Sequence, residues 1–176
     1  MLGIVFVEFS QMVEQRFSPA VLDAAIDRAA PASGGAYTAV GSYPHAEMVA
    51  LVSALSHETQ LPVPALIRTF GEYMFDRLAA PFPMYVQDLA HPFELFARLD
   101  GLIHKEVRML YPEAELPKFV FTRLGEREAD LVYSSPRHLA DLAEGLIVGA
   151  LSHFGCSGQI GRHDEGPSTT FRITLA

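Results

Sequence analysis

The first part of the chain repeats apolar residues at helical spacing. Within residues 2–17 apolar side chains recur three or four positions apart, which places them on one face of a helix. Similar runs begin at Pro19, Pro44 and Pro64, and a proline suits the first helical turn because its missing N–H needs no partner there. Ser18 is a suitable N-cap for the second run. We therefore predict a bundle of helices in this part.

A longer helical pattern runs from about Asp88 to Tyr111, where Pro112 ends it. His104 lies on the apolar side of this predicted helix, and positions three or four residues away share that face. One such neighbour is the carboxylate Asp100. Asp100 and three other acidic residues near the end of the helix are expected to be solvated. The other three are Glu106, Glu113 and Glu115.

The pattern then changes to the alternation of strands. Four segments fit it, the first two as a hairpin: 118–124, 129–134, 157–163 and 169–175. Between the second and third, we predict a helix with Ser135 as its N-cap and Pro136 at its first position, ended by Gly155. Helices followed by an antiparallel sheet indicate an α+β fold, and no linker divides the chain.

Composition narrows the classes of partner. The chain has 176 residues, enough for one domain with its own core, and a formal net charge of −8. This acidic balance argues against binding to nucleic acid or to an anionic membrane. With Cys156 as the single cysteine, no disulfide framework is possible within the chain, and a cytoplasmic location is expected. No apolar stretch is long enough to span a bilayer.

The most informative residues are Tyr133, Ser135, Arg137 and His104. Arginine offers a planar fork of donors to a carboxylate, and two hydroxyls at alternating positions add further hydrogen bonds. Imidazole is a common metal ligand. Haem combines a metal with two carboxylates, so these residues together indicate a haem site. Taken singly, His104 also fits a core histidine, and the other three fit a strand end followed by a helix cap.

Other candidate residues are weaker. His153, Cys156 and His163 have the spacing of half a zinc site, but no further cysteine completes it. Four other histidines are expected at the surface: His45, His57, His91 and His138. No glycine-rich phosphate loop follows a strand, and no nucleophile–base pair suggests hydrolysis. We therefore do not expect an enzyme.

The chain resembles the H-NOX family of haem nitric oxide/oxygen-binding domains, which includes the haem domain of soluble guanylate cyclase. The resemblance rests on segments spread over most of the chain: Met1–Phe6, Leu99–Val107, Leu110–Pro112, Pro117, Tyr133-x-Ser135-x-Arg137 and the helix to Gly149. It implies haem b, with His104 as the proximal iron ligand and Pro117 against the porphyrin. Tyr133, Ser135 and Arg137 are then a carboxylate clamp that binds the haem propionates. It also implies one domain over residues 1–176, with haem between a distal helical part (about 1–60) and a proximal part (about 61–176) that holds a four-stranded antiparallel sheet.

The family pattern also implies a distal wall above the haem: Val5, Phe9, Met74, Leu78, Leu142 and Leu146. Oxygen-storing members have a tyrosine at position 142 and polar residues near positions 9 and 74, whereas this chain is apolar at all three. Bound dioxygen carries partial negative charge and needs a hydrogen-bond donor more than NO or CO does. The resemblance therefore implies a sensor that prefers NO and also binds CO.

Such a sensor signals when NO weakens or breaks the bond between iron and His104. No output domain is recognised in the chain, so a separate partner is expected, a histidine kinase or a cyclic-di-nucleotide enzyme by analogy with bacterial members. Three alternatives remain open. They are a haem-free ligand-binding or interaction module on the same fold, a haem enzyme such as a peroxidase or NO dioxygenase, and a redox sensor acting through Cys156.

Overall fold

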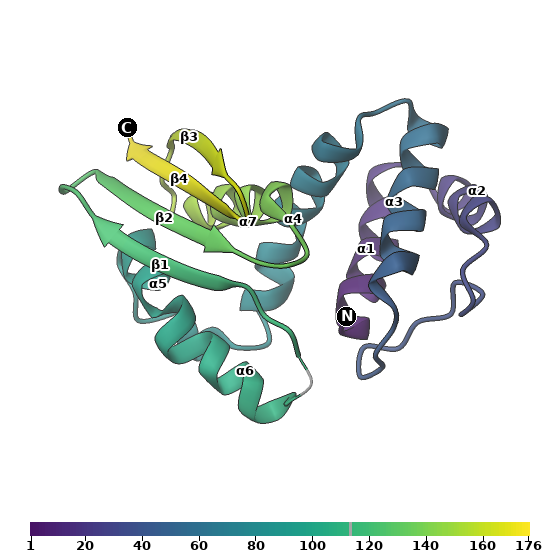
Figure 1. The fold of residues 1–176 in the computed structure, drawn as a ribbon, viewed down its shortest axis with the longest axis horizontal. Coiled ribbons are helices and arrows are strands. Elements are labelled where there is room, and N and C mark those ends of the chain that lie inside the picture. The colour runs from purple at the N-terminus through teal and green to yellow at the C-terminus, as the bar shows by residue number, and fades with distance from the viewer. Residues whose placement is uncertain (113) are drawn as a thin grey trace.

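The computed structural model describes residues 1–112 and 114–176, and it confirms the α+β fold (Figure 1). Helices come first and a four-stranded antiparallel sheet follows, with one helix inserted between its second and third strands. The elements in chain order are α1 (Gly3–Arg16), α2 (Pro19–Ala29), α3 (His45–Thr59), α4 (Val63–Ala79), the 3₁₀ turn η1 (Pro83–Tyr85), α5 (Pro92–Arg98), the π-helical turn η2 (Leu99–Ile103), α6 (His104–Leu110), β1 (Lys118–Arg123), β2 (Glu128–Ser134), α7 (Ala140–His153), β3 (Gly158–Glu165) and β4 (Ser168–Leu175).

The N-terminal helices begin where the sequence predicts. Ser18 caps α2, because its side-chain oxygen accepts a hydrogen bond of 3.2 Å from the Val21 N–H. The first helical residue of α3 follows Pro44, and α4 starts at Val63, one residue before Pro64. Proline in or just before the first turn thus marks these helix starts as expected.

These helices share one hydrophobic core. Phe6 and Phe9 of α1 are almost completely buried, as are Leu55 of α3 and Leu66 of α4. The rings of Phe9 and Phe70 meet edge to face with their centroids 5.4 Å apart. Each such side chain contributes about 1.5–3 kcal/mol on burial, so this core is the main source of stability for the helical part.

A second core lies under the sheet. The strands are ordered β1-β2-β4-β3, with every neighbouring pair antiparallel. Along β2 burial alternates, so Leu131 points into the core while Asp130 points away from it, and Phe171 of β4 lies opposite Leu131. Phe93 of α5 and Ile147 of α7 belong to the same core. The sheet therefore has one face covered by helices, as the alternating pattern predicts.

The helix expected from about Asp88 to Tyr111 is interrupted. Its middle is the π-helical turn η2, in which the backbone N–H of His104 donates to the Leu99 carbonyl rather than to that of Asp100. A π-turn accommodates one extra residue in a helix and is often found at functional sites. Periodicity over the whole segment did not detect it, because one wide turn hardly changes the positions of the apolar residues on either side.

The predicted start of the last helix is wrong. α7 begins at Ala140 and not at Pro136. His138 has a left-handed backbone with φ of 50°, which a helix does not allow, and the Leu139 N–H donates instead to the hydroxyl of Tyr133 on the sheet. Ser135 accepts a hydrogen bond from the Arg137 N–H within a turn, so it caps no helix. The expected end is correct, since Gly155 follows α7 with φ of 63°.

Helices α4 and α7 cross at two glycines. A β-carbon placed on Gly71 would lie 2.4 Å from the Leu142 carbonyl oxygen, and one on Gly145 would lie 2.1 Å from that of Arg68. Only glycine allows the two backbones to approach this closely. In Figure 1, α4 runs from the bundle formed by α1, α2 and α3 to the sheet-bearing part. This crossing therefore joins the two hydrophobic cores.

In the described residues, none of the helices combines the length and the apolar character that a bilayer span requires.

Candidate cofactor site

His104 is the first residue of α6, directly after the π-turn. Its side chain is mostly buried, with 14% of its surface exposed. The imidazole ring lies 5.7 Å from the ring of Phe119 on β1, between centroids. Phe119 in turn lies 5.5 Å from the ring of Tyr133 on β2. The fold thus connects His104 to the carboxylate clamp through one aromatic side chain, although they are far apart in sequence.

Burial lowers the pKa of His104, while the carboxylate of Asp100 acts in the opposite direction with a smaller effect. The backbone of Pro117 also lies against the imidazole and favours its charged form. The net lowering keeps the ring neutral near pH 7, and the neutral form is the one that ligates a metal. His104 therefore has the position and the protonation state of a ligand.

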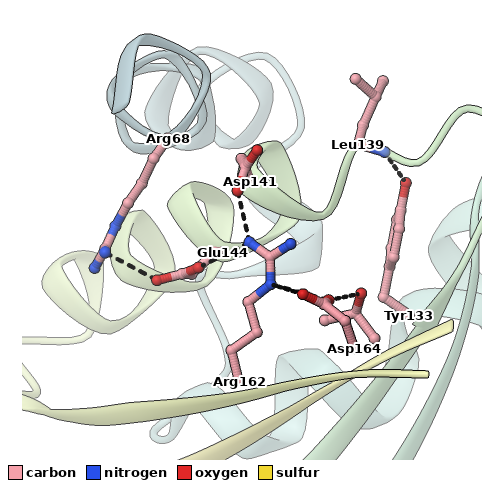
Figure 2. Close-up of polar contacts among 8 residues, drawn as sticks. Arg68, Tyr133, Leu139, Asp141, Glu144, Arg162 and Asp164 are labelled. Carbon is pink, nitrogen blue, oxygen red and sulfur yellow. Dashed lines mark hydrogen bonds and ion pairs between the residues drawn. The ribbon is translucent and has the colours of Figure 1, made fainter. Parts of the chain in front are cut away.

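Tyr133 is buried at the end of β2, with 3% of its surface exposed. Figure 2 shows its hydroxyl accepting a hydrogen bond of 3.0 Å from the Leu139 N–H just before α7. The Ser135 hydroxyl accepts one of 3.2 Å from the Arg137 N–H. Both hydroxyl hydrogens remain available to donate, because each hydroxyl carries one donor beside its acceptor lone pairs. The turn between β2 and α7 thus presents donors.

The guanidinium of Arg137 binds a carboxylate in this structure. Its Nη2 donates to Oε2 of Glu115 over 2.7 Å, and its Nη1 donates to the Glu115 carbonyl over 3.3 Å. Glu115 is itself largely exposed, with 71% of its side chain accessible. An exposed partner of this kind is held weakly and is displaced at little cost. The contact shows that Arg137 is oriented to take a carboxylate from outside the core.

A network of charged side chains joins α7 to α4 and to β3 (Figure 2). Arg162 of β3 binds Asp141 of α7 over 2.5 Å and Asp164 over 3.0 Å. Arg68 of α4 binds Glu144 of α7 over 2.9 Å. Although burial acts to lower it, hydrogen bonds to Asp164 and Asp141 raise the pKa of Arg162. Because several charges act together, this network holds α7 against both α4 and the sheet more firmly than one surface ion pair would.

The residues expected in the distal wall come from α1, α4 and α7. Phe9 and Met74 are buried in the helical core, and Val5, Leu142 and Leu146 are partly buried against it. Leu78, at the end of α4, is 42% exposed. Val5 and Leu142 also line a cavity of about 80 Å³ whose walls are almost entirely apolar. That volume is far below the roughly 300–1,000 Å³ of a cofactor pocket, so this cavity by itself fits no more than a small gas molecule.

The chain matches the Haem-NO-binding (HNOB) family over residues 2–161. It belongs to the H-NOX family. No curated protein sequence matches it. Its structure is similar to that of the unliganded Fe(II) H-NOX protein from K. algicida, with a TM-score of 0.91 and 31% identity over 100% of this chain and 97% of that one.

Two further H-NOX structures show similar agreement. The S. oneidensis H-NOX protein in its Fe(II)NO state has a TM-score of 0.90 and 28% identity, covering 100% of this chain and 99% of that one. The Shewanella woodyi H-NOX in its Fe(II)CO state has a TM-score of 0.85 and 38% identity, covering 100% and 95%. The fold expected from the resemblance is therefore confirmed over the whole chain. H-NOX domains are haem-based gas sensors and not generally catalysts.

The residues of this H-NOX domain fit haem. Nδ1 of His104 is buried and lacks a hydrogen-bond partner among the described residues. A buried polar atom without a partner costs free energy, so the imidazole is not yet held as it would be in an occupied ligand site. Arg137 already binds a carboxylate, and the hydroxyls of Tyr133 and Ser135 belong to the same turn between β2 and α7. His104 would hold the iron, these three residues would hold the propionates, and Pro117 lies against the same imidazole.

Four carboxylates were expected to be solvated, and the three that the structure describes have different surroundings. Oδ1 of Asp100 is buried, so that expectation is wrong for this atom. Glu106 accepts a hydrogen bond from the Tyr85 hydroxyl, and Glu115 binds Arg137. Glu113 lies outside the described residues. The spacing of four residues between Asp100 and His104 is the one signal in the sequence that the two side chains lie close together. No sequence pattern indicates the pairing of Glu115 with Arg137.

Among the described residues, the three side chains considered as half a zinc site do not form a ligand cluster. His153 lies 3.4 Å from Asp76, and the Cys156 thiol contacts the Phe154 carbonyl. Within residues 1–112 and 114–176, no three metal-ligating side chains gather in one place.

His45 was expected at the surface, and this is wrong for its Nε2 atom. That nitrogen is buried and has no hydrogen-bond partner in residues 1–112 and 114–176, and the ring lines the cavity beside Val5 and Leu142. Burial lowers the pKa of His45, and the positive charge of Arg137 lowers it further. The sequence could not show this, because only the fold brings the start of α3 near Arg137.

We expect His45 to make the protein less stable as the solution becomes more acidic. The ordinary pKa is 6.5 and the folded value is lower, so the unfolded chain binds the proton first. The contribution of His45 is therefore complete above about pH 6.5 and is lost as the pH falls below it. Urea unfolding at several pH values should show a steeper loss in the wild type than in His45→Gln. Equal slopes would contradict the assignment.

Proposed function

We propose that this protein senses nitric oxide through a ferrous haem b held by His104. The observation that carries the proposal is the combination of a buried, neutral imidazole with a carboxylate-binding turn beside it. Membership of the H-NOX family supports the same cofactor. We further propose that residues 1–176 form a single haem domain, with the haem between the helical part and the sheet-bearing part.

The preference for NO follows from the side chains expected above the haem. Phe9, Met74 and Leu142 offer no hydrogen-bond donor, and all three belong to or pack on the helical core. A ferrous haem supplies an iron that binds diatomic gases. Dioxygen bound there gains much of its stability from a donor, whereas NO and CO do not depend on one. We therefore expect NO and CO to be the ligands, as in the Fe(II)NO and Fe(II)CO states of the S. oneidensis H-NOX protein.

The chain's own residues convert ligand binding into a change of shape. With His104 as the iron ligand, NO binding would weaken or break its bond to iron and would release His104 and α6 from the site. Tyr133, Ser135 and Arg137 would hold the propionates in both states and would not discriminate between gases. A partner that binds the two states differently reads the change. We propose a histidine kinase or a cyclic-di-nucleotide enzyme as this partner. A cytoplasmic location is compatible with the single cysteine.

An absorbance spectrum of the reduced protein tests this proposal. We expect a ferrous haem spectrum without ligand, a stable NO complex and no stable oxy complex in air. The physical reason is the absence of a donor among the expected wall residues. The measurement also gives the coordination number of the NO complex, because five- and six-coordinate complexes absorb differently.

Failure to incorporate haem, when haem is supplied during expression, would contradict the proposal and favour a haem-free module on the same fold. A long-lived oxy complex would contradict the preference for NO. In that case the His45→Leu variant tests whether the His45 imidazole is the hydrogen-bond donor to dioxygen, because this ring lines the cavity beside Leu142. Peroxide turnover assays test the remaining alternative of a haem enzyme.

A further inference from the structure

Among the described residues, two buried polar atoms at the π-turn have no hydrogen-bond partner and lie close together. They are Nδ1 of His104 and Oδ1 of Asp100, and they lie 3.7 Å apart. An imidazole N–H and a carboxylate oxygen are complementary, and a hydrogen bond between them normally measures about 2.7–2.9 Å. The pair is therefore less than about 1 Å from a hydrogen bond that would satisfy both atoms.

The backbone explains why Asp100 is in this position. The N–H of His104 donates to the Leu99 carbonyl, so the wide turn of η2 encloses Asp100 and ends at His104. Gly101, within that turn, has open space where a β-carbon would be. The turn can therefore adjust by a small amount without a clash. The Asp100 side chain is 34% exposed as a whole, but its Oδ1 is directed into the protein toward the imidazole.

We infer that Asp100 is the positioning residue of the proximal histidine, with its carboxylate accepting the Nδ1–H of His104 when Nε2 is bound to iron. This inference rests on the proposed haem function. A ligand imidazole whose second nitrogen donates to a carboxylate is held in one tautomer and one orientation, and it becomes a stronger ligand. Asp100 thus sets the strength of the bond on which the signal depends.

The Pro117 backbone is the competing acceptor, because it also lies against the imidazole. A carbonyl and a carboxylate differ in charge, so they affect the iron–histidine bond differently. The neutral, nearly isosteric change Asp100→Asn removes that charge and retains an acceptor oxygen. The substitution therefore separates the effect of the negative charge from the effect of the side-chain volume.

Resonance Raman spectroscopy of the ferrous, unliganded protein tests the inference. We expect the iron–histidine stretching frequency to fall in Asp100→Asn and to fall further in Asp100→Ala. Haem should also dissociate faster from both variants, by about 10–100-fold, the usual effect of losing an outer partner of a metal ligand. Glu94→Gln is the matched control. It removes a carboxylate from the first turn of α5 and should leave the frequency unchanged.

The outcomes distinguish this inference from the proposed function. If the wild type binds no haem, the proposed function is wrong and the role of Asp100 is wrong with it. If haem-loaded Asp100→Asn has the wild-type frequency and dissociation rate, only the role of Asp100 is wrong, and Pro117 is the acceptor. Circular dichroism of each variant shows whether it is folded. Should Asp100→Ala fail to fold, the near-isosteric Asp100→Asn still decides between the two acceptors.

Discussion

His104→Ala should abolish the normal ferrous haem spectrum. The Soret band should be lost or strongly shifted, because alanine offers no ligand to iron. The loss of haem should exceed the roughly 10–100-fold effect of removing an outer partner of a metal ligand. Adding imidazole to the solution should restore a spectrum close to that of the wild type, since a free imidazole can take the place of the missing side chain. Absorbance spectra of the purified, reduced protein measure both effects.

His57→Ala is the matched control for this experiment. His57 lies on α3 with 61% of its side chain exposed, so its removal should leave the haem spectrum unchanged. An unchanged ferrous spectrum in His104→Ala would show that another residue ligates the iron. Haem loss that imidazole does not reverse would instead point to collapse of the site, which the far-ultraviolet circular dichroism of the variant would reveal.

Gly145→Ala should destabilise the protein by about 3 kcal/mol, at the upper end of the usual cost of overpacking. The new methyl carbon would lie 2.1 Å from the Arg68 carbonyl oxygen and 2.8 Å from the Gly71 α-carbon. These are backbone atoms, which cannot rotate out of the way as a side chain does. Helices α4 and α7 would have to separate, and urea unfolding followed by circular dichroism measures the result.

Gly101→Ala is the control for this second change. Gly101 is also a helical glycine, but no atom of the described residues lies within 4 Å of the place where its β-carbon would be. Alanine there should be neutral or stabilise the protein by about 0.5–1 kcal/mol, because it restricts the unfolded chain. If Gly145→Ala proved equally harmless, the close crossing of α4 and α7 would be wrong.

Local physics explains why so much of the fold was predictable. The start of α2 is determined by Ser18 and Pro19, through a hydrogen bond and a fixed φ that involve only neighbouring residues. The strands of the sheet follow from alternation, since β2 buries every second side chain. The sequence proposes His104 and the turn containing Tyr133, Ser135 and Arg137 as haem-binding residues because a haem site needs particular residue types in a particular order.

The sequence predictions were wrong where a residue distant in the sequence determines the local conformation. Ser135 and Pro136 have the features of a helix start, yet α7 begins later because the Tyr133 hydroxyl takes the Leu139 N–H and His138 adopts a left-handed backbone. The π-turn before His104 was hidden because apolar spacing barely registers one extra residue. His45 resembled a surface histidine until the fold placed it near Arg137.

By itself, the sequence determined most of the helices and strands, the α+β class and the family, and it proposed the residues of a haem site, because each depends on neighbours along the chain or on a motif. Only the tertiary structure decided which polar atoms are buried, that Glu115 binds Arg137, and that Asp100 faces His104. It also decided that α4 and α7 cross at two glycines, Gly71 and Gly145. The reason is physical: burial, charge proximity and backbone contact depend on distances between segments, and those distances exist only once the chain is folded.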